Sequence, residues 1–349
     1  MKNLKLAIIL SCTTIISVCN AKADEPFTTS LFIDSYSAYA KNELTNKERP
    51  YFTQASQNND YHLNLASAGL GFDDGKMRGK LVGQYGDSVD INYNTEPEDS
   101  FKFVQESYLG FYLDDKTSMD VGTFLAHIGA ESWLSKDNLN YTRSYIAEFS
   151  PYYETGVRLT HKFDNNWSGQ LLGVNGWQNT TDNRHPALGT QLSYSDNGLT
   201  LTSNTFIGEE NFGTRLFHDF IANKTFESGF SLIGSIDVGN QSDSSTQEGT
   251  WWGYSVMGRQ TLNDILSVNG RFESYEDPNG IIVTSVTGEE FKAYGASVGL
   301  DASLGSGFFL RGELKHLFSQ NSIFKDNQDD RDNDTLFVIS LSFFDENKF

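Results

Sequence analysis

The sequence predicts an all-β fold, a closed antiparallel transmembrane β-barrel of about 16 strands, within a range of about 14 to 18. Three observations favour this fold. The chain opens with an export signal, apolar and polar residues alternate along many segments, and the connectors between these segments alternate between long and short.

The N-terminus has the pattern of a cleavable signal peptide. Lys2 and Lys5 form a positive region, an apolar stretch follows, and an Ala-Lys-Ala sequence ends at Ala23. The apolar stretch is shorter than the roughly 20 residues of a membrane-spanning helix. We therefore expect cleavage near Ala23, which divides the chain into a signal peptide, residues 1–23, and a single outer-membrane barrel domain, residues 24–349.

The cysteines and the net charge exclude several classes of protein. Both cysteines, Cys12 and Cys19, lie within the signal, so the mature chain has no disulfide, thiol nucleophile or thiolate metal site. Lipid attachment at Cys19 is the less favoured alternative to simple cleavage. The sequence has 46 acidic and 26 basic residues and a formal net charge of −20, which repels nucleic acid.

Strand-like segments follow one another along the whole mature chain. In the last of them, Phe337, Ile339 and Leu341 alternate with Ser340 and Ser342. Such a period of two gives each strand one apolar and one polar face. The predicted strands are 31–42, 60–72, 77–86, 101–113, 118–126, 151–163, 167–177, 188–195, 199–208, 214–226, 229–238, 251–261, 265–275, 290–303, 307–317 and 335–344.

The connectors are of two kinds. Short ones carry turn residues, as in Asp196-Asn197-Gly198 and Gly305-Ser306-Gly307, which tolerate the backbone of tight hairpins. Long polar ones alternate with them, and only 209–213 is short on that side. Bacterial barrels place short turns in the periplasm and long loops outside. The long connectors are 43–59, 87–100, 127–150, 178–187, 239–250, 276–289 and 318–334.

Several stretches resemble the putative β-barrel porin-2 family, an OmpL-like group of outer-membrane porins. They are Leu31 to Tyr36, Gly129 to Glu131, Asn140 to Ser144, Pro151 to Leu159 and Val174 to Trp177. The resemblance covers residues 31–344. It implies one barrel in the outer membrane of a Gram-negative bacterium and a porin-like role without enzymatic activity, and it brings no catalytic residues.

The connector 127–150 is the third external loop and the longest. In sixteen-stranded porins this loop folds into the barrel and narrows it. Its apolar residues gain by leaving water, so we expect the same fold here. The alternative is an external loop that packs on its neighbours. The charged candidates for a constriction are Glu131, Lys136, Asp137, Arg143 and Glu148, interleaved with Trp133, Leu134, Tyr141, Tyr145 and Ile146.

Basic residues recur on the polar faces of the predicted strands. If lipid covers the other face, they point into the lumen, where we expect them to face the carboxylates of the loop 127–150 and so to orient polar solutes. The alternative is a ladder of salt bridges with Glu106, Asp120, Glu273 and Glu313 that stiffens the wall. The basic wall comprises Arg78, Lys80, Arg158, Arg259, Arg271, Arg311 and Lys315.

Tryptophans near predicted strand ends are candidates for membrane-interface anchors. They are Trp167, Trp177, Trp251 and Trp252. Stacking of a sugar in the pore, with Trp133 as the best representative, is the alternative. The acidic segment 326–334 lacks the glycine and glutamate of an EF-hand, and the histidines have no metal-ligand spacing. We expect no metal and no cofactor.

These patterns together predict a passive porin for small polar solutes or ions, surrounded by outer-membrane lipid and lipopolysaccharide. Porins often form trimers, so a homotrimer is an oligomeric state that the resemblance allows. A structural or adhesive barrel with a closed lumen and partner-binding loops is the alternative, and a barrel enzyme comes third because no nucleophile motif appears.

Overall fold

The protein was analysed as a computed structural model. It describes residues 25–44, 47–94, 100–181, 185–210, 213–242 and 248–349. The expected signal peptide, residues 1–23, lies outside the described residues. Within them, no helix is long and apolar enough to cross a membrane.

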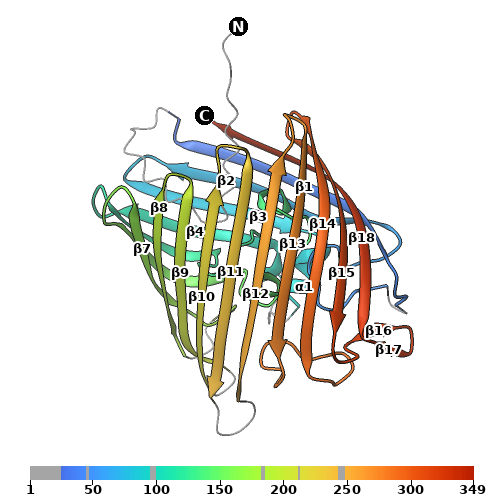
Figure 1. The fold of residues 1–349 in the computed structure, drawn as a ribbon. Coiled ribbons are helices and arrows are strands. Elements are labelled where there is room, and N and C mark those ends of the chain that lie inside the picture. Colours follow the sequence, from blue (N-terminus) through green and yellow to red (C-terminus); the bar gives the residue numbers. More distant parts are fainter. Residues whose placement is uncertain (1–24, 45–46, 95–99, 182–184, 211–212, 243–247) are drawn as a thin grey trace.

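Sixteen antiparallel strands form one closed barrel, which confirms the predicted fold class (Figure 1). Each strand pairs with its neighbours in the chain, and the last strand, β18, closes the barrel against β1. The remaining elements lie in the long connectors. The barrel strands are β1 Phe27–Ala40, β2 Tyr61–Asp73, β3 Met77–Tyr85, β4 Val104–Tyr112, β5 Thr117–Leu125, β6 Tyr153–Lys162, β7 Trp167–Val174, β8 Ala187–Asp196, β9 Leu199–Glu210, β10 Gly213–Thr225, β11 Phe230–Ser242, β12 Gly249–Thr261, β13 Leu266–Asp277, β14 Phe291–Gly305, β15 Phe308–Ser319 and β18 Asn333–Lys348. The others are α1 Asp87–Asn92, α2 Tyr145–Glu148, the 3₁₀ turns Phe101–Phe103 and Ser135–Asp137, and the hairpin β16 Phe324–Asp326 with β17 Asp329–Arg331.

Alternation along the strands separates the two faces of the wall. In β18 the side chains of Phe337, Ile339 and Leu341 are 45 to 48% exposed on the outside, whereas Ser340 and Ser342 are buried inside. Successive residues of a strand point to opposite faces, and an apolar outer face suits lipid. Polar residues of the strands therefore line the lumen.

The final strand is longer than the sequence indicated. We expected it to end at Phe344, with a separate charged tail of residues 345–349. Instead β18 runs to Lys348, which pairs with Thr28, and Phe27 and Phe349 exchange two backbone hydrogen bonds of 3.1 and 3.0 Å. The charged tail lies at the short-turn end of the barrel, where exposed charges cost little, so pairing with β1 continues through it.

The short and long connectors lie at opposite ends of the barrel. At the short end, Asn197 and Gly198 have φ values of 52° and 73°, which form a tight hairpin turn. At the other end, apolar residues of two long connectors are buried, among them Phe52 in the first and Ile281 and Val283 in the seventh. The lumen at the long-connector end is therefore occupied by loops, and these loops surround the site described next.

Introducing a charged residue on the outer face tests whether lipid covers that face of the barrel. Ile236 lies outward near the middle of β11 and Leu232 lies outward near its short-turn end. Ile236→Arg should lower the free energy of unfolding in phospholipid vesicles by about 2–4 kcal/mol, and Leu232→Arg by about 0–1 kcal/mol. Urea titrations followed by tryptophan fluorescence measure both. Equal effects at the two positions would contradict a lipid-covered outer face.

Candidate functional site

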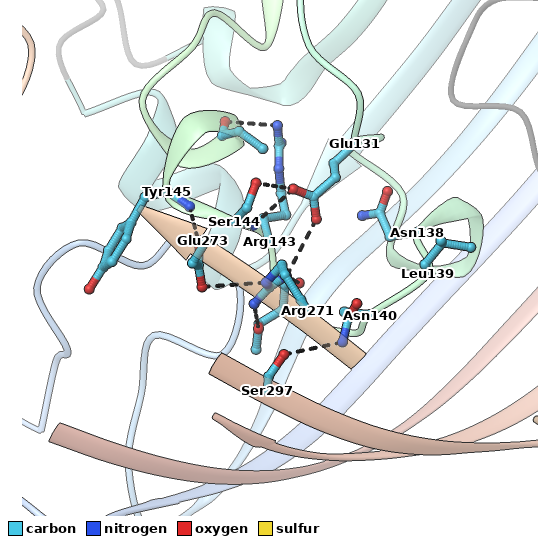
Figure 2. A network of polar contacts seen from close by, with 12 residues as sticks. Glu131, Asn138, Leu139, Asn140, Arg143, Ser144, Tyr145, Arg271, Glu273 and Ser297 are labelled. Atoms are coloured by element: carbon cyan, nitrogen blue, oxygen red, sulfur yellow. Dashed lines mark hydrogen bonds and ion pairs between the residues drawn. The ribbon is translucent and has the colours of Figure 1, made fainter. Parts of the chain in front are cut away.

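The connector between β5 and β6, residues 126–152, lies within the barrel, and we call it the lumen loop. Its side chains Trp133, Tyr141, Tyr145 and Ile146 are all at most 4% exposed. Figure 2 shows the loop against the inner wall, with its polar groups directed at β13 and its neighbours. The apolar groups that interleave with charges in the sequence are thus removed from water, which favours this position.

Arg271, on the inner face of β13, is the main contact between loop and wall (Figure 2). Its Nη1 donates to the Thr142 carbonyl at 2.5 Å, and its Nη2 donates to the Thr142 hydroxyl at 2.9 Å. The guanidinium also forms ion pairs with Glu131 of the loop at 3.5 Å and with Glu273 and Glu313 of the wall at 3.3 and 3.4 Å. Such a buried charge is tolerable because three carboxylates surround it and both of its terminal nitrogens donate hydrogen bonds.

The wall carboxylates beside Arg271 hold the loop as well. Glu313 accepts hydrogen bonds from the backbone N–H of Thr142 at 2.7 Å and from its hydroxyl at 2.9 Å. Glu273 accepts from the backbone N–H of Tyr145 at 2.6 Å. Loop residues 142–145 are therefore held by wall groups of both charges, because the carboxylates accept hydrogen bonds from them and Arg271 donates to them.

Other basic residues of the wall bind backbone carbonyls of the loop. Arg311 donates to the carbonyls of Ser135 at 2.5 Å and Leu139 at 2.9 Å. Arg259 also donates to Leu139, at 3.0 Å, and Lys315 donates to the Arg143 carbonyl at 3.0 Å. We had expected loop carboxylates to face these cations. Instead, most of the loop groups that accept hydrogen bonds from these cations are backbone carbonyls, because a folded loop has more carbonyls than side-chain carboxylates.

Three basic residues of the predicted wall form their ion pairs within the strands. Arg78 and Arg158 pair with Asp120 at 2.6 and 2.9 Å, and Lys80 pairs with Glu106 at 2.5 Å. These contacts have the geometry of the salt-bridge ladder that we considered as the alternative role. The basic residues are thus divided between bracing the strands and anchoring the loop.

The charged loop residues are in different environments. Glu131 accepts hydrogen bonds from the Ser144 backbone N–H and hydroxyl, and burial raises its pKa although Arg271 opposes this. Glu148 accepts from the Tyr152 hydroxyl at 2.7 Å. Asp137 and Lys136 pair at 2.6 Å. Only Glu131 of these carboxylates has an ion pair with a wall arginine among the described residues.

The loop is also attached to strands that the sequence had not marked as part of the site. Asp34 of β1 accepts a hydrogen bond from the Ser135 hydroxyl at 2.8 Å. Gln84 of β3 accepts from the Trp133 indole at 2.9 Å, and Asp219 of β10 accepts from the Gly129 backbone at 2.7 Å. All three lie at inward positions of their strands. The alternation of inward and outward residues in the sequence could have predicted these inward positions. It could not predict which inward polar residues contact a loop.

At the start of the lumen loop, His127 bridges two strands. Its Nδ1 lies 2.9 Å from Glu154 of β6 and its Nε2 lies 2.9 Å from the Thr205 carbonyl of β9. Burial lowers the pKa of His127, but Glu154, the Thr205 carbonyl and Asp219 together more than offset this, so the pKa is raised above its usual value. A doubly protonated ring donates to both acceptors, which fixes the base of the loop.

Two of the four predicted interface tryptophans are inside the barrel. Trp167 and Trp252 are outward and partly exposed, whereas Trp251 is 1% exposed. Trp177 makes an edge-to-face contact with Phe206 on the inner side of the wall, with ring centroids 5.0 Å apart. Assigning Trp251 and Trp252 to the same interface was wrong, because adjacent residues of a strand point to opposite faces. The interface role predicted for Trp177 was also wrong, because its side chain packs against the inward residues Phe206 and Phe217.

Comparison with known families gives one match over nearly the whole chain. The model of the family described as putative beta-barrel porin-2, OmpL-like, matches residues 26–344. No curated protein matches the chain significantly.

Solved outer-membrane proteins share the architecture. The anion-selective porin from Comamonas acidovorans is 10% identical with a TM-score of 0.60, and the match covers 92% of this chain and 100% of that porin. OprB of Pseudomonas putida has a TM-score of 0.61 at 9% identity, covering 92% and 95%. The channel DcaP of Acinetobacter baumannii has a TM-score of 0.60 at 11% identity, and the match covers 93% of this chain and 99% of that channel. At such identities the likeness shows the fold alone.

Removal of the central guanidinium tests the loop's anchoring. Arg271→Met leaves Glu273 and Glu313 buried without their main partner, so the free energy of unfolding should fall by about 3–5 kcal/mol. Arg331→Met, in the exposed hairpin β16–β17, removes surface ion pairs and should cost about 0–1 kcal/mol. Denaturant titrations of both variants in detergent measure the difference. A cost at Arg271 no larger than that at Arg331 would contradict the network.

Proposed function

Because this chain belongs to the OmpL-like putative β-barrel porin-2 family of outer-membrane porins, we propose that it is a passive diffusion channel for small hydrophilic solutes, constricted by the lumen loop. The observation that carries the proposal is the set of contacts between this loop and inward residues of β1, β3, β10 and β12 to β15. A barrel of this size would otherwise hold a wide aqueous channel.

The mechanism requires no chemical step. Solutes diffuse down their gradient through the space that the lumen loop leaves, and size is the first criterion of passage. Fixed charges at the loop then orient polar solutes and disfavour apolar ones. The candidates for this role are Lys136, Asp137 and Arg143 on the loop, since most wall cations are already paired with carboxylates or carbonyls.

Shortening the lumen loop tests the constriction. Replacing residues 132–146 by a short Gly-Ser linker should leave the barrel folded, because Arg271, Glu273, Glu313 and Lys315 still pair with one another. Single-channel conductance in planar bilayers should then rise several-fold. The matched control shortens the exposed tip of the hairpin β16–β17, residues 327–330, and should leave conductance unchanged. Equal conductance of the loop variant and the intact protein would remove the basis for a constriction.

A second candidate function is a structural or adhesive barrel with a closed lumen. The observation that favours it is that the lumen loop contacts strands on many sides of the barrel, with the first and seventh connectors packed above it. The same conductance measurement separates the two. A wild-type protein that inserts but does not conduct favours the closed barrel.

Two finer features of the mature protein belong to this proposal. Cleavage after Ala23 would give a chain that begins at Asp24, and the intact mass of the membrane-extracted protein checks it. We also expect outer-membrane lipid and lipopolysaccharide around the barrel, with a homotrimer as one assembly that porins adopt. The mass of the detergent-extracted particle distinguishes a trimer from a monomer.

A further inference from the structure

A cavity lies where the lumen loop leaves β5 and returns to β6. Its volume is about 180 Å³, and Ile128, Trp133, Asp137, Arg143 and Tyr152 are among the residues that line it. Buried cavities of about 150 Å³ admit a molecule the size of benzene. The space is therefore large enough for an organic solute of about six to eight non-hydrogen atoms.

Arg143 differs from the arginines of the barrel wall. Those form ion pairs with carboxylates, as Arg271 and Arg311 do. The Arg143 guanidinium lies 4.0 Å above the Tyr152 ring and donates from Nη2 to the Ala147 carbonyl at 2.8 Å. Within the described residues, its Nε and Nη1 have no hydrogen-bond partner, although the side chain is only 3% exposed.

Buried donors of this kind favour an anionic oxygen acceptor. An unpaired buried N–H costs free energy, and a planar guanidinium matches a carboxylate especially well. Glu131 lies beside Arg143 in Figure 2 but directs its carboxylate to Ser144 and Arg271. Arg143 lines the cavity, so its guanidinium contributes a positive charge to a lining of mixed polar and apolar residues.

The other lining residues narrow the class of solute. Carboxylates of Glu131 and Asp137 border the same cavity, so a doubly charged anion is repelled while an ammonium group is attracted. Ile128, Trp133 and Pro151 offer apolar contact. A solute with one carboxylate, one ammonium group and a small apolar side chain satisfies all three kinds of surface.

We propose that this cavity is a binding site for small zwitterionic amino acids with apolar side chains. The carboxylate pairs with the Arg143 guanidinium, the ammonium group faces Asp137, and the side chain packs on Trp133. This inference rests on the proposed function, because the cavity then lies on the path of a permeating solute and favours its passage over that of other solutes.

Titration calorimetry of the detergent-solubilised full-length mature protein tests the site with three matched probes. L-valine carries both charged groups, valinol lacks the carboxylate and isovalerate lacks the ammonium group. Valine should bind saturably, and each analogue should bind at least about ten-fold more weakly, the cost of one lost charged hydrogen-bonding group. Valine and valinol binding alike, or no saturable binding of valine, would overturn the proposal and leave a water-filled cavity.

Substitution of Arg143 assigns the binding to this cavity. Arg143→Met should weaken valine binding by about ten-fold or more and leave valinol binding unchanged. Arg331→Met on the external hairpin is the matched control and should bind valine like the wild type. Unchanged valine binding in Arg143→Met overturns the assignment. If that variant does not fold, Arg143→Lys, which keeps the charge, and the three probes on the wild type decide the question.

The result is distinguishable from that of the conductance experiment. A protein that conducts but does not bind valine retains the proposed function and loses this site. A protein that binds valine but does not conduct retains the site and loses the channel.

Discussion

The buried ion pairs of Arg271 are the interaction on which the internal arrangement depends. One guanidinium on β13 contacts a carboxylate of the lumen loop, two carboxylates of the wall and both oxygens of Thr142. A buried charge is costly unless opposite charges and hydrogen bonds compensate it. The loop therefore supplies hydrogen-bond and ion-pair partners for the polar groups of the wall, and these groups in turn determine where the loop lies.

This mutual dependence follows from what surrounds the barrel. Lipid on the outer face requires apolar side chains there, so the strands' polar residues accumulate in the lumen. An open lumen would leave these groups to water, whereas here many bind loop carbonyls and backbone N–H groups. The loop's aromatic residues, such as Trp133 and Tyr145, fill the remaining space. Under the proposed function, the width and charge of the lumen would depend on this loop and on the connectors packed against it.

Much of the barrel could be predicted from the sequence because its determinants are local. The period of two in β18, the turn residues at Asn197 and Gly198 and the alternation of connector lengths each act within a few residues. Strand ends were less accessible: the charged tail after Phe344 looked like a termination, yet pairing with β1 carried β18 to Lys348. That outcome depends on a partner more than 300 residues away in the chain.

The site was predictable only in part, for the same reason. Strand parity placed Arg271 and Arg311 inside the barrel, and the same parity places the adjacent residues Trp251 and Trp252 on opposite faces of the wall. Nothing local indicated that loop carbonyls would meet the arginines, or that Asp34 would bind loop residue Ser135, 101 residues away in the chain. Those contacts arise from the fold of a long connector in a confined space.

Cross-linking of the loop to the wall tests the central claim most directly. Asn140 of the lumen loop donates a hydrogen bond to Ser297 of β14 at 3.2 Å, and the mature chain has no cysteine if it begins near Asp24. In the double variant Asn140→Cys and Ser297→Cys, a short bis-methanethiosulfonate linker should join the two thiols rapidly and leave single-channel conductance unchanged. A failure to cross-link, or a conductance that falls once the loop is tethered, would mean that the loop does not rest in the lumen.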